Sequence, residues 1–469
     1  MALTNTHIGN QNIENALKNT GSVYFIGIGG VSMSCLAEMS LERGLRVGGS
    51  DRTPSDLTHM LENKGITVYY GHRASQIEGY GAVVYTLAID IENEEYQAAI
   101  KKGIPCISRA DFLGYLMGGY QNRIGVSGMH GKSTTTAMLA AVFEAAKKRP
   151  TVVSGAALSH SEGCYRKGDT DHFIYEACEY MDSFLSFYPT IAVILNVELD
   201  HTDYFASLDA VCHSFALALK RLSPDGIVVL NGDDENVMRI AEMVKDKKQI
   251  TFGLSEAADV RATELSQKKG IFSFSLIYQG KNLGRISLGI EGRHHVYNAL
   301  ATATAALASG VSFEELAEGL LSFKGARRRM EYHATLDCVD IYEDYAHHPT
   351  EIRATLLTAK EMTKGDVWCV FQSHTYSRTA ELFEDFADAL SLADHTLLLP
   401  IYAARETDTR GVSGKKLASA LSCPADYVAS FSDAADYIRE NAKSGDLVII
   451  MGAGDVFHVL DELGIRSCS

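Results

Sequence analysis

The sequence predicts an α/β fold made of several domains with mostly parallel sheets. Short apolar strands alternate with helix-like segments along the chain, which is the pattern of parallel α/β architecture. The length of 469 residues corresponds to two to four domains, at roughly 100–200 residues per domain. Polar residues also follow many of the strands. We place three domains at 1–120, 121–328 and 329–469.

Composition and charge limit the classes of function. A formal net charge of −16 gives no basic footprint for nucleic acid or an anionic membrane. The nine cysteines are scattered, without a C-x-x-C pair, which is typical of reduced thiols in a cytoplasmic protein. The N-terminus lacks a signal-peptide pattern, and no run approaches the ~20 apolar residues that span a bilayer. We expect a soluble cytoplasmic protein with neither a nucleic-acid nor a membrane partner.

The first domain contains a nucleotide-binding pattern. The apolar strand SVYFIGIGG supplies Gly27, Gly29 and Gly30 before a helix, and the next strand, LRVGGSD, ends at Asp51. This is nearly the dinucleotide fingerprint, except that Ser32 stands at the third glycine position. It predicts a diphosphate at the helix N-terminus and Asp51 near a ribose. The alternative is that the glycines serve only tight strand–helix packing.

The second domain contains a phosphate loop of unusual length. The strand NRIGVSG leads into GMHGKST at 128–134, and a Thr-rich helix follows. A standard P-loop needs a glycine at position 126, where Val126 stands, so the spacing predicts a shortened variant. Lys132 would supply a charge to phosphate and Ser133 a hydroxyl to Mg²⁺. The alternative is an ordinary glycine turn into a helix.

Acidic and imidazole side chains follow two further strands of this domain. Glu176 ends FIYEAC, and Asp200 and His201 follow TIAVILNV. Taken singly, such residues are more often surface or capping residues. Taken with the phosphate loop, they favour a Mg²⁺ site. Between 260 and 290 the sequence alternates like antiparallel strands, and residues 294–310 read as a helix rich in small residues.

The third domain places histidines and an arginine just after its strands. His347 and His348 lie in DYAHHP, and His374 and Arg378 lie in QSHTYSR. No zinc-ligand spacing supports a metal here, and arginine suits a carboxylate ligand. Each histidine could equally be a capping or solvated residue. The arginine run at 327–329 is either a solvated face or a phosphate clamp at the domain boundary.

The order and spacing of these segments, together with GRHHVYNAL at 292–300 and MGAGD at 451–455, resemble the Mur ligase family over nearly the whole chain. The G-x-H-G-K-[ST] loop is the form that this family uses for ATP. The resemblance implies Rossmann-like first and third domains around a central P-loop-type ATPase domain. It implies an ATP-dependent ligase of peptidoglycan precursor synthesis, which joins L-alanine to the lactyl carboxylate of UDP-N-acetylmuramate through an acyl phosphate.

The resemblance also implies a role for each domain. The first domain would bind the UDP-sugar through Gly27, Gly29, Gly30, Ser32, Asp51, His72, Thr86, Ala88 and Ile89. ATP would contact Gly128, Met129, His130, Gly131, Lys132, Ser133, Thr134, Asn298 and Arg329. Mg²⁺, with Mn²⁺ as an alternative, would bind Ser133, Glu176 and His201. The alanine side would involve Tyr345, His347, His374 and Arg378. The residues expected to act in catalysis are Lys132, Glu176, His201, His347 and Arg378.

Four positions depart from the family pattern, and other functions remain as alternatives. Met129 and Ser133 stand where many relatives have threonine. His295 replaces a common asparagine, and Thr375 stands where some relatives have a second arginine. A sister ligase that attaches a preformed murein peptide to the same UDP-sugar would share most of these features. An NAD-dependent oxidoreductase would leave the 128–134 loop unexplained. A nucleotide sensor would bind ATP and UDP without turnover. The protein would be a monomer or a homodimer.

Overall fold

The computed structural model describes residues 3–155, 163–169, 171–202, 204–404 and 406–465. The chain divides into two compact units. The first comprises Met1–Arg261, Ile277–Asn282 and Leu300–Gly319, and the second comprises Ala262–Leu276, Leu283–Ala299 and Leu320–Ser469. No helix among the described residues is both long enough and apolar enough to cross a membrane.

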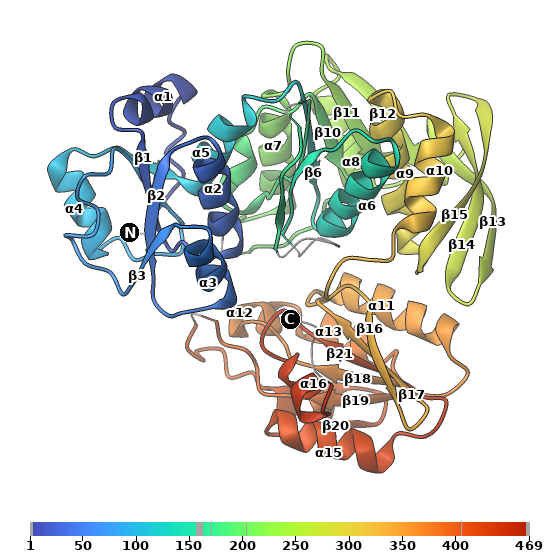
Figure 1. Ribbon diagram of the computed structural model, residues 1–469. Helices are drawn as coiled ribbons and strands as arrows, with labels where there is room; N and C mark the ends of the chain where they lie inside the picture. The colour runs from blue at the N-terminus through green and yellow to red at the C-terminus, as the bar shows by residue number, and fades with distance from the viewer. Residues whose placement is uncertain (1–2, 156–162, 170, 203, 405, 466–469) are drawn as a thin grey trace. The chain divides into compact units, whose positions relative to one another are not determined.

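A five-stranded parallel sheet opens the first unit. Its strands are β1 (Ser22–Ile26), β2 (Arg46–Asp51), β3 (Thr67–Tyr70), β4 (Val83–Tyr85) and β5 (Cys106–Ser108), in the order β3-β2-β1-β4-β5. The helices are α1 (Asn10–Lys18), α2 (Val31–Glu42), α3 (Asp56–Asn63), α4 (Glu94–Lys102) and α5 (Arg109–Met117). Val23 and Phe25 pack with α1, α2 and α5, whereas Tyr24 and Ile26 pack with α4. Figure 1 shows α4 on one side of this sheet and α2 and α5 on the other. Burial on both faces explains why the residues of β1 after Ser22 are all large and mostly apolar.

A second, mostly parallel sheet follows in the same unit. Its strands are β6 (Asn122–Ser127), β7 (Thr151–Val153), β8 (Tyr165–Arg166), β9 (His172–Glu176), β10 (Ile191–Ile194), β11 (Ile227–Asn231) and β12 (Lys248–Gly253). They pair in the order β12-β11-β10-β6-β9-β7-β8, with β8 antiparallel to β7. The other elements are α6 (Lys132–Ala145), the 3₁₀ segment η1 (Tyr180–Ser186), α7 (Leu208–Leu219) and α8 (Glu235–Met243). The central position of β6 places the phosphate loop between β9 and β10.

Three strands and two helices then lead toward the C-terminal part. β13 (Val260–Lys268), β14 (Ile271–Tyr278) and β15 (Lys281–Glu291) are hydrogen-bonded in that order. The two connections are two-residue turns whose residues have positive φ, namely Lys269, Gly270, Gln279 and Gly280. Because two-residue turns join antiparallel strands, the predicted antiparallel segment is confirmed. The helices α9 (His294–Ala308) and α10 (Phe313–Ser322) follow, and α9 matches the predicted small-residue helix.

The C-terminal sheet has six strands, β16 (Glu331–Leu336), β17 (Val339–Asp344), β18 (Val367–Phe371), β19 (His395–Leu398), β20 (Ala425–Tyr427) and β21 (Leu447–Met451). Their order is β16-β17-β21-β18-β19-β20, and β16 is antiparallel to β17 while the other pairs are parallel. The helices are α11 (Pro349–Met362), α12 (Tyr376–Glu381), α13 (Phe383–Leu390), α14 (Gly414–Ala420), α15 (Phe431–Asn441) and α16 (His458–Glu462).

Alternate residues of the central strands bury opposite faces of this sheet. Trp368 and Val370 pack with α15 and α16, whereas Cys369 and Phe371 pack with α11, α13 and α14. Helices therefore cover both faces (Figure 1). The predicted α/β class with mostly parallel sheets is confirmed.

Candidate active site

The first glycine loop joins β1 to α2 and is fixed by the end of β2. The N–H of Gly27 donates to the carbonyl oxygen of Ser50 over 2.8 Å, and the N–H of Gly29 donates to Asp51 Oδ2 over 2.8 Å. A Cβ at Gly29 would lie 2.9 Å from that carboxylate oxygen, so a larger residue would displace the loop. Asp51, predicted to lie near a ribose, therefore also fixes the shape of the loop.

The other residues predicted for this site surround the loop. Gly30 is the N-cap of α2, and Ser32 lies half-buried in the first turn of that helix. After β4 the N–H groups of Ala88 and Ile89 donate to the side-chain and main-chain oxygens of Thr86, over 3.3 Å each. A Cβ at the first loop glycine would lie 3.0 Å from Thr86 Cγ2. The structure thus brings both segments to the carboxyl edge of the sheet, where parallel sheets bind ligands.

His72 follows β3 at the same edge and contacts a carboxylate that the sequence pattern does not single out. Its Nδ1 lies 2.8 Å from Glu95 Oε2. Glu95 lies in the first turn of α4, after the N-cap Asn93, and its side chain is completely buried. The sequence gives little signal for this contact because Glu95 lies 23 residues from His72 in a segment without a nucleotide-binding pattern.

The second glycine loop turns sharply between β6 and α6. The φ angles are +134° at Gly128 and +82° at Gly131, which glycine adopts readily. Because α6 begins at Lys132, the unpaired N–H groups of its first turn are available to an anion. Ser133 and Thr134 are buried in that turn. This geometry is that of a short anion-binding loop.

Asn196, just after β10, clamps this loop. Its Oδ1 accepts the N–H of His130 over 2.8 Å, and its Nδ2 donates to the carbonyl oxygen of His130 over 3.0 Å. The main-chain oxygen of Asn196 also accepts the N–H of Met129 over 3.2 Å. One side chain thus satisfies both peptide groups of the loop histidine. Asn196 is a residue that the sequence interpretation missed, although it opens the NVELDH segment.

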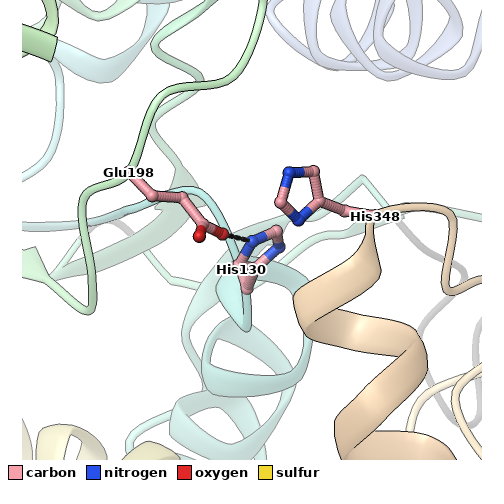
Figure 2. Close-up of side chains that lie close together, drawn as sticks. All are labelled: His130, Glu198 and His348. Carbon is pink, nitrogen blue, oxygen red and sulfur yellow. Dashed lines mark hydrogen bonds and ion pairs between the residues drawn. The ribbon is translucent and has the colours of Figure 1, made fainter. Parts of the chain in front are cut away.

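His130 itself contacts a second carboxylate. Its Nε2 interacts with Glu198 Oε1, as Figure 2 shows. Glu198 lies two residues after the clamping asparagine, in the same segment after β10. The backbone and the ring of His130 are therefore both held by one stretch of chain. This explains a histidine before the Gly-Lys pair without assigning it to chemistry.

Lys132 pairs with a buried carboxylate. Its Nζ donates to Glu179 Oε1 over 3.0 Å and to the carbonyl oxygens of Gly128 and Met129. Burial lowers the pKa of Lys132, but the negative charge of Glu179 outweighs that effect and raises it above its ordinary value. Burial likewise raises the pKa of Glu179, but Lys132 and His201 outweigh it and lower the pKa. Both groups are charged at neutral pH.

His201 completes this cluster. Its Nε2 lies 3.4 Å from Glu179 Oε1, and its ring packs on Tyr180 with centroids 4.6 Å apart. The backbone N–H of His201 donates to Asp200 Oδ1 over 2.7 Å. Asp200 therefore shapes the turn that positions His201.

The two glutamates of the segment EACEYMDSF (residues 176–184), Glu176 and Glu179, have different contacts. Glu176, the one favoured by the sequence, accepts hydrogen bonds at Oε1 from Ser154 Oγ and from the N–H of Gly155. Glu179 instead contacts Lys132 and His201, and its buried Oε2 has no hydrogen-bond partner among the described residues. A buried carboxylate oxygen without a donor beside an imidazole fits a divalent cation. The feature of the sequence that could have indicated Glu179 is its position as the second acidic residue of this segment, just beyond the end of β9.

In the second unit, the predicted residues after β17 and β18 lie together. His347 Nδ1 lies 3.0 Å from the carbonyl oxygen of Tyr345, and the His347 and His374 ring centroids are 6.2 Å apart. His374 also stacks on Tyr402, at 5.5 Å. Arg378 lies on α12, close enough for its charge to act on both histidines. The structure therefore brings all four predicted residues into one cluster.

The electrostatics of this cluster keep its histidines neutral. Burial lowers the pKa of His347 to about 4. The positive charges of Arg378 and Arg329 act in the same direction, and the negative charge of Glu351 opposes them. Burial and Arg378 likewise lower the pKa of His374. Thr375, between His374 and α12, has a φ of +69°, which is rare for a threonine. This strained residue starts the helix that carries Arg378.

The three arginines at 327–329 have different surroundings. Arg328 is an anchor, since its Nε donates to Glu343 Oε1 over 2.5 Å and its guanidinium lies 4.9 Å from the Tyr345 ring centroid. Arg329 lies 5.2 Å from the same ring centroid and 3.5 Å from Glu351 Oε1. Arg327 is the most exposed, 3.8 Å from a carboxylate oxygen of Glu331. Neither a wholly solvated face nor a uniform phosphate clamp describes this run.

The predicted adenine-side residue lies at the start of α9. Asn298 Nδ2 is 3.1 Å from His295 Nδ1, and the rings of His294 and His295 have centroids 3.9 Å apart. Burial, with the charge of Arg329, lowers the pKa of His294 to about 4. His295, which departs from the family pattern, thus contacts Asn298 directly.

Family models match most of the chain. The Mur ligase family catalytic-domain model matches residues 22–121, the Mur ligase middle-domain model residues 126–306, and the Mur ligase glutamate-ligase-domain model residues 328–454.

Curated relatives and solved structures are similar over nearly the full length. The UDP-N-acetylmuramate–L-alanine ligase of Clostridium novyi is 42% identical over 446 residues, covering 94% of this chain and 96% of the relative. The enzyme of the same name from Lachnospira eligens is 43% identical over 451 residues, covering 94% and 97%. The crystal structure of UDP-N-acetylmuramate–alanine ligase MurC from Thermotoga maritima matches with a TM-score of 0.79 and 27% identity, covering 95% and 98%. A murein peptide ligase from Psychrobacter arcticus shares the fold, with a TM-score of 0.71 and 23% identity over 96% of this chain and 100% of that one.

Proposed function

Because the chain belongs to the Mur ligase family, we propose that it joins L-alanine to UDP-N-acetylmuramate and converts ATP to ADP and phosphate. The observation that carries the proposal is the 42% identity over 94% of the chain to a ligase of that name. The Lys132 site supports it, because a short phosphate loop with a buried lysine and a carboxylate suits phosphoryl transfer.

The reaction has two steps. The lactyl carboxylate of the sugar attacks the γ-phosphorus of ATP, which forms an acyl phosphate and releases ADP. The amine of L-alanine then attacks the acyl carbon, and phosphate leaves from the tetrahedral intermediate with formation of the amide. Lys132 and the N–H groups at the start of α6 neutralise charge on the transferred phosphoryl group.

A divalent cation, Mg²⁺ or alternatively Mn²⁺, would be held by Glu179 and His201, with Ser133 from the loop. The buried Oε2 of Glu179 without a hydrogen-bond partner supports this choice. Such a cation supplies neutralisation of phosphate charge. Glu176 remains a proposed residue of the same site, because its charge acts on Lys132.

The second unit would bind the amino acid. Arg378 suits the alanine carboxylate, since a guanidinium binds a carboxylate with two parallel hydrogen bonds. A neutral His347 avoids repelling the amine of the incoming alanine. Asn298 and Arg329 would lie on the nucleotide side. In this scheme the UDP-sugar belongs to residues 1–120, ATP to 121–328 and alanine to 329–469, in the cytoplasm, as a monomer or homodimer.

Phosphate release against an amino-acid panel tests the proposal. Release should need ATP, UDP-N-acetylmuramate and L-alanine together, and Lys132→Ala should abolish it. Release that depends on a preformed tripeptide but not on alanine would instead indicate a ligase of murein peptides. Absence of release with every acceptor, despite ATP binding, would overturn the proposal.

A further inference from the structure

Glu95 is a fully buried carboxylate in the first domain. Its side chain is 0% exposed, and an unpaired charge in such a place would be strongly unfavourable. Tyr24 Oη donates to its Oε1 over 2.6 Å, and Ser50 Oγ donates to its Oε2 over 2.6 Å. His72 Nδ1 lies 2.8 Å from Oε2. Three side chains from three different strands or strand ends therefore converge on one carboxylate.

These contacts determine which ring nitrogen of His72 carries a proton. Glu95 Oε2 is an acceptor toward Ser50, and Ser50 Oγ, whose proton is used, is a second acceptor 3.0 Å from Nδ1. A lone pair on Nδ1 would face two acceptors and be repelled, so Nδ1 must be the donor. The nitrogen Nε2 then lies on the opposite side of the ring.

The cluster lies where a ligand of this sheet would bind. His72 follows β3, and Ser50 is the last residue but one of β2. Both therefore lie at the carboxyl edge of the sheet, beside the glycine loop that Asp51 holds. The His72 side chain keeps 19% of its surface exposed while Glu95 keeps none. The imidazole therefore reaches the surface and the carboxylate stays behind it.

We propose that Glu95 is a positioning residue, which holds His72 with its proton on Nδ1 so that Nε2 accepts a hydrogen bond from the N3–H of a uracil base. This inference rests on the proposed function, because it needs a uridine nucleotide in the first domain. Uracil has an N–H at this position, whereas cytosine has a lone pair. A neutral Nε2 acceptor would bind the first and repel the second, so the Glu95–His72 pair selects the base.

A spectroscopic measurement tests the tautomer in the unmodified protein. Selective ¹⁵N-histidine labelling, with the His72 signal assigned through a His72→Asn variant, distinguishes a proton on Nδ1 from one on Nε2. The expected result is protonated Nδ1 and unprotonated Nε2 in the free protein. A proton on Nε2 with bare Nδ1, or on both nitrogens, would overturn the proposal.

Binding measurements test the function of the pair. Glu95→Gln keeps the shape of the side chain and removes its charge, and Glu94→Gln makes the same change at the exposed neighbouring residue. Titration calorimetry with UDP, CDP and ATP should show UDP affinity about tenfold weaker in E95Q, a smaller preference for UDP over CDP, and unchanged ATP affinity. E94Q should match the unmodified protein in all three affinities.

The outcomes separate the inference from the function on which it rests. If the unmodified protein binds neither UDP nor UDP-N-acetylmuramate, the proposed function fails. If it binds UDP but E95Q leaves both affinity and base preference unchanged, only the role of Glu95 fails. Equal weakening of UDP and CDP by E95Q would indicate a merely structural role and would also overturn the inference.

Discussion

Lys132 and Glu179 form a buried ion pair at the start of α6, with Nζ 3.0 Å from Oε1 and the Glu179 side chain only 1% exposed. Among the described residues, Nζ also donates to the carbonyl oxygens of Gly128 and Met129 in its own loop. A phosphate that takes over Lys132 would leave Glu179 as a buried charge without its partner, which is strongly unfavourable. We infer that nucleotide binding exchanges this pair for two new ones, lysine with phosphate and glutamate with a divalent cation.

The first prediction distinguishes the two glutamates of the EACEYMDSF segment. Glu179→Gln should lower alanine-dependent phosphate release by roughly 10²-fold and raise the Mg²⁺ concentration needed for half-maximal rate, because Glu179 contacts both Lys132 and His201. Glu176→Gln is the matched change three residues earlier, and its loss should be smaller. Magnesium titrations of both variants provide the measurement. A larger rise in the Mg²⁺ requirement for E176Q would assign the cation to Glu176 instead.

The second prediction concerns stability in the absence of ligands. Lys132→Ala removes one partner of a buried pair, so the free energy of unfolding should fall by about 3 kcal/mol. Adding Glu179→Gln to that variant neutralises the stranded carboxylate and should restore part of the loss, although both proteins are inactive. Urea unfolding of the unmodified protein, both single variants and the double variant gives the coupling energy. Purely additive losses would mean that the pair contributes no coupling to the fold.

The third prediction concerns the clamp on the phosphate loop. Asn196→Ala removes both side-chain hydrogen bonds to the His130 backbone, so ATP affinity should fall by roughly tenfold. Asn196→Asp keeps the acceptor for the His130 N–H but loses the donor. Its loss of ATP affinity should be intermediate from the hydrogen bonds alone, and repulsion between its charge and phosphate would make that loss larger. UDP affinity serves as the control, because the clamp does not contact the first glycine loop. Equal losses of ATP and UDP affinity would point to general unfolding.

The fold could be read from the sequence where local pattern and burial agree. The strand before Lys132 is apolar where it is buried on both faces, from Ile124 to Val126, and the glycines at 128 and 131 are needed for their positive φ. These features are local, so periodicity and turn chemistry suffice to predict them.

The partners of the candidate site could be predicted less well. Glu179, Asn196 and Glu95 contact Lys132, His130 and His72 across 47, 66 and 23 positions of the chain. Such pairs form only when neighbouring strands bring their ends together. In the segment EACEYMDSF (residues 176–184), the position at the strand end favoured Glu176 as the site residue. The structure instead uses Glu179, which is followed by a turn through the left-handed residues Met181 and Asp182. Positive φ at two consecutive non-glycine residues is not predictable from residue type.

The fourth prediction is a pH dependence of stability with a defined sign. Burial lowers the pKa of His347 in the fold to about 4, against ~6.5 in an unfolded chain. Between these values the unfolded chain binds a proton that the folded chain does not, so His347 destabilises the fold progressively as the pH falls from about 7 to about 4. The difference corresponds to up to ~3 kcal/mol. Asp344, whose pKa burial raises to about 6, opposes this trend, because its protonated form is favoured in the fold.

Replacing the imidazole separates these two contributions. His347→Gln removes the histidine contribution and leaves Asp344, so urea midpoints should fall less between pH 7 and pH 4.5 than in the unmodified protein. His59→Gln, at an exposed histidine, should leave the acid limb unchanged. If His347→Gln and His59→Gln have identical acid limbs, His347 takes up its proton in the fold as readily as in the unfolded chain. The proposed neutral imidazole on the alanine side would then be wrong.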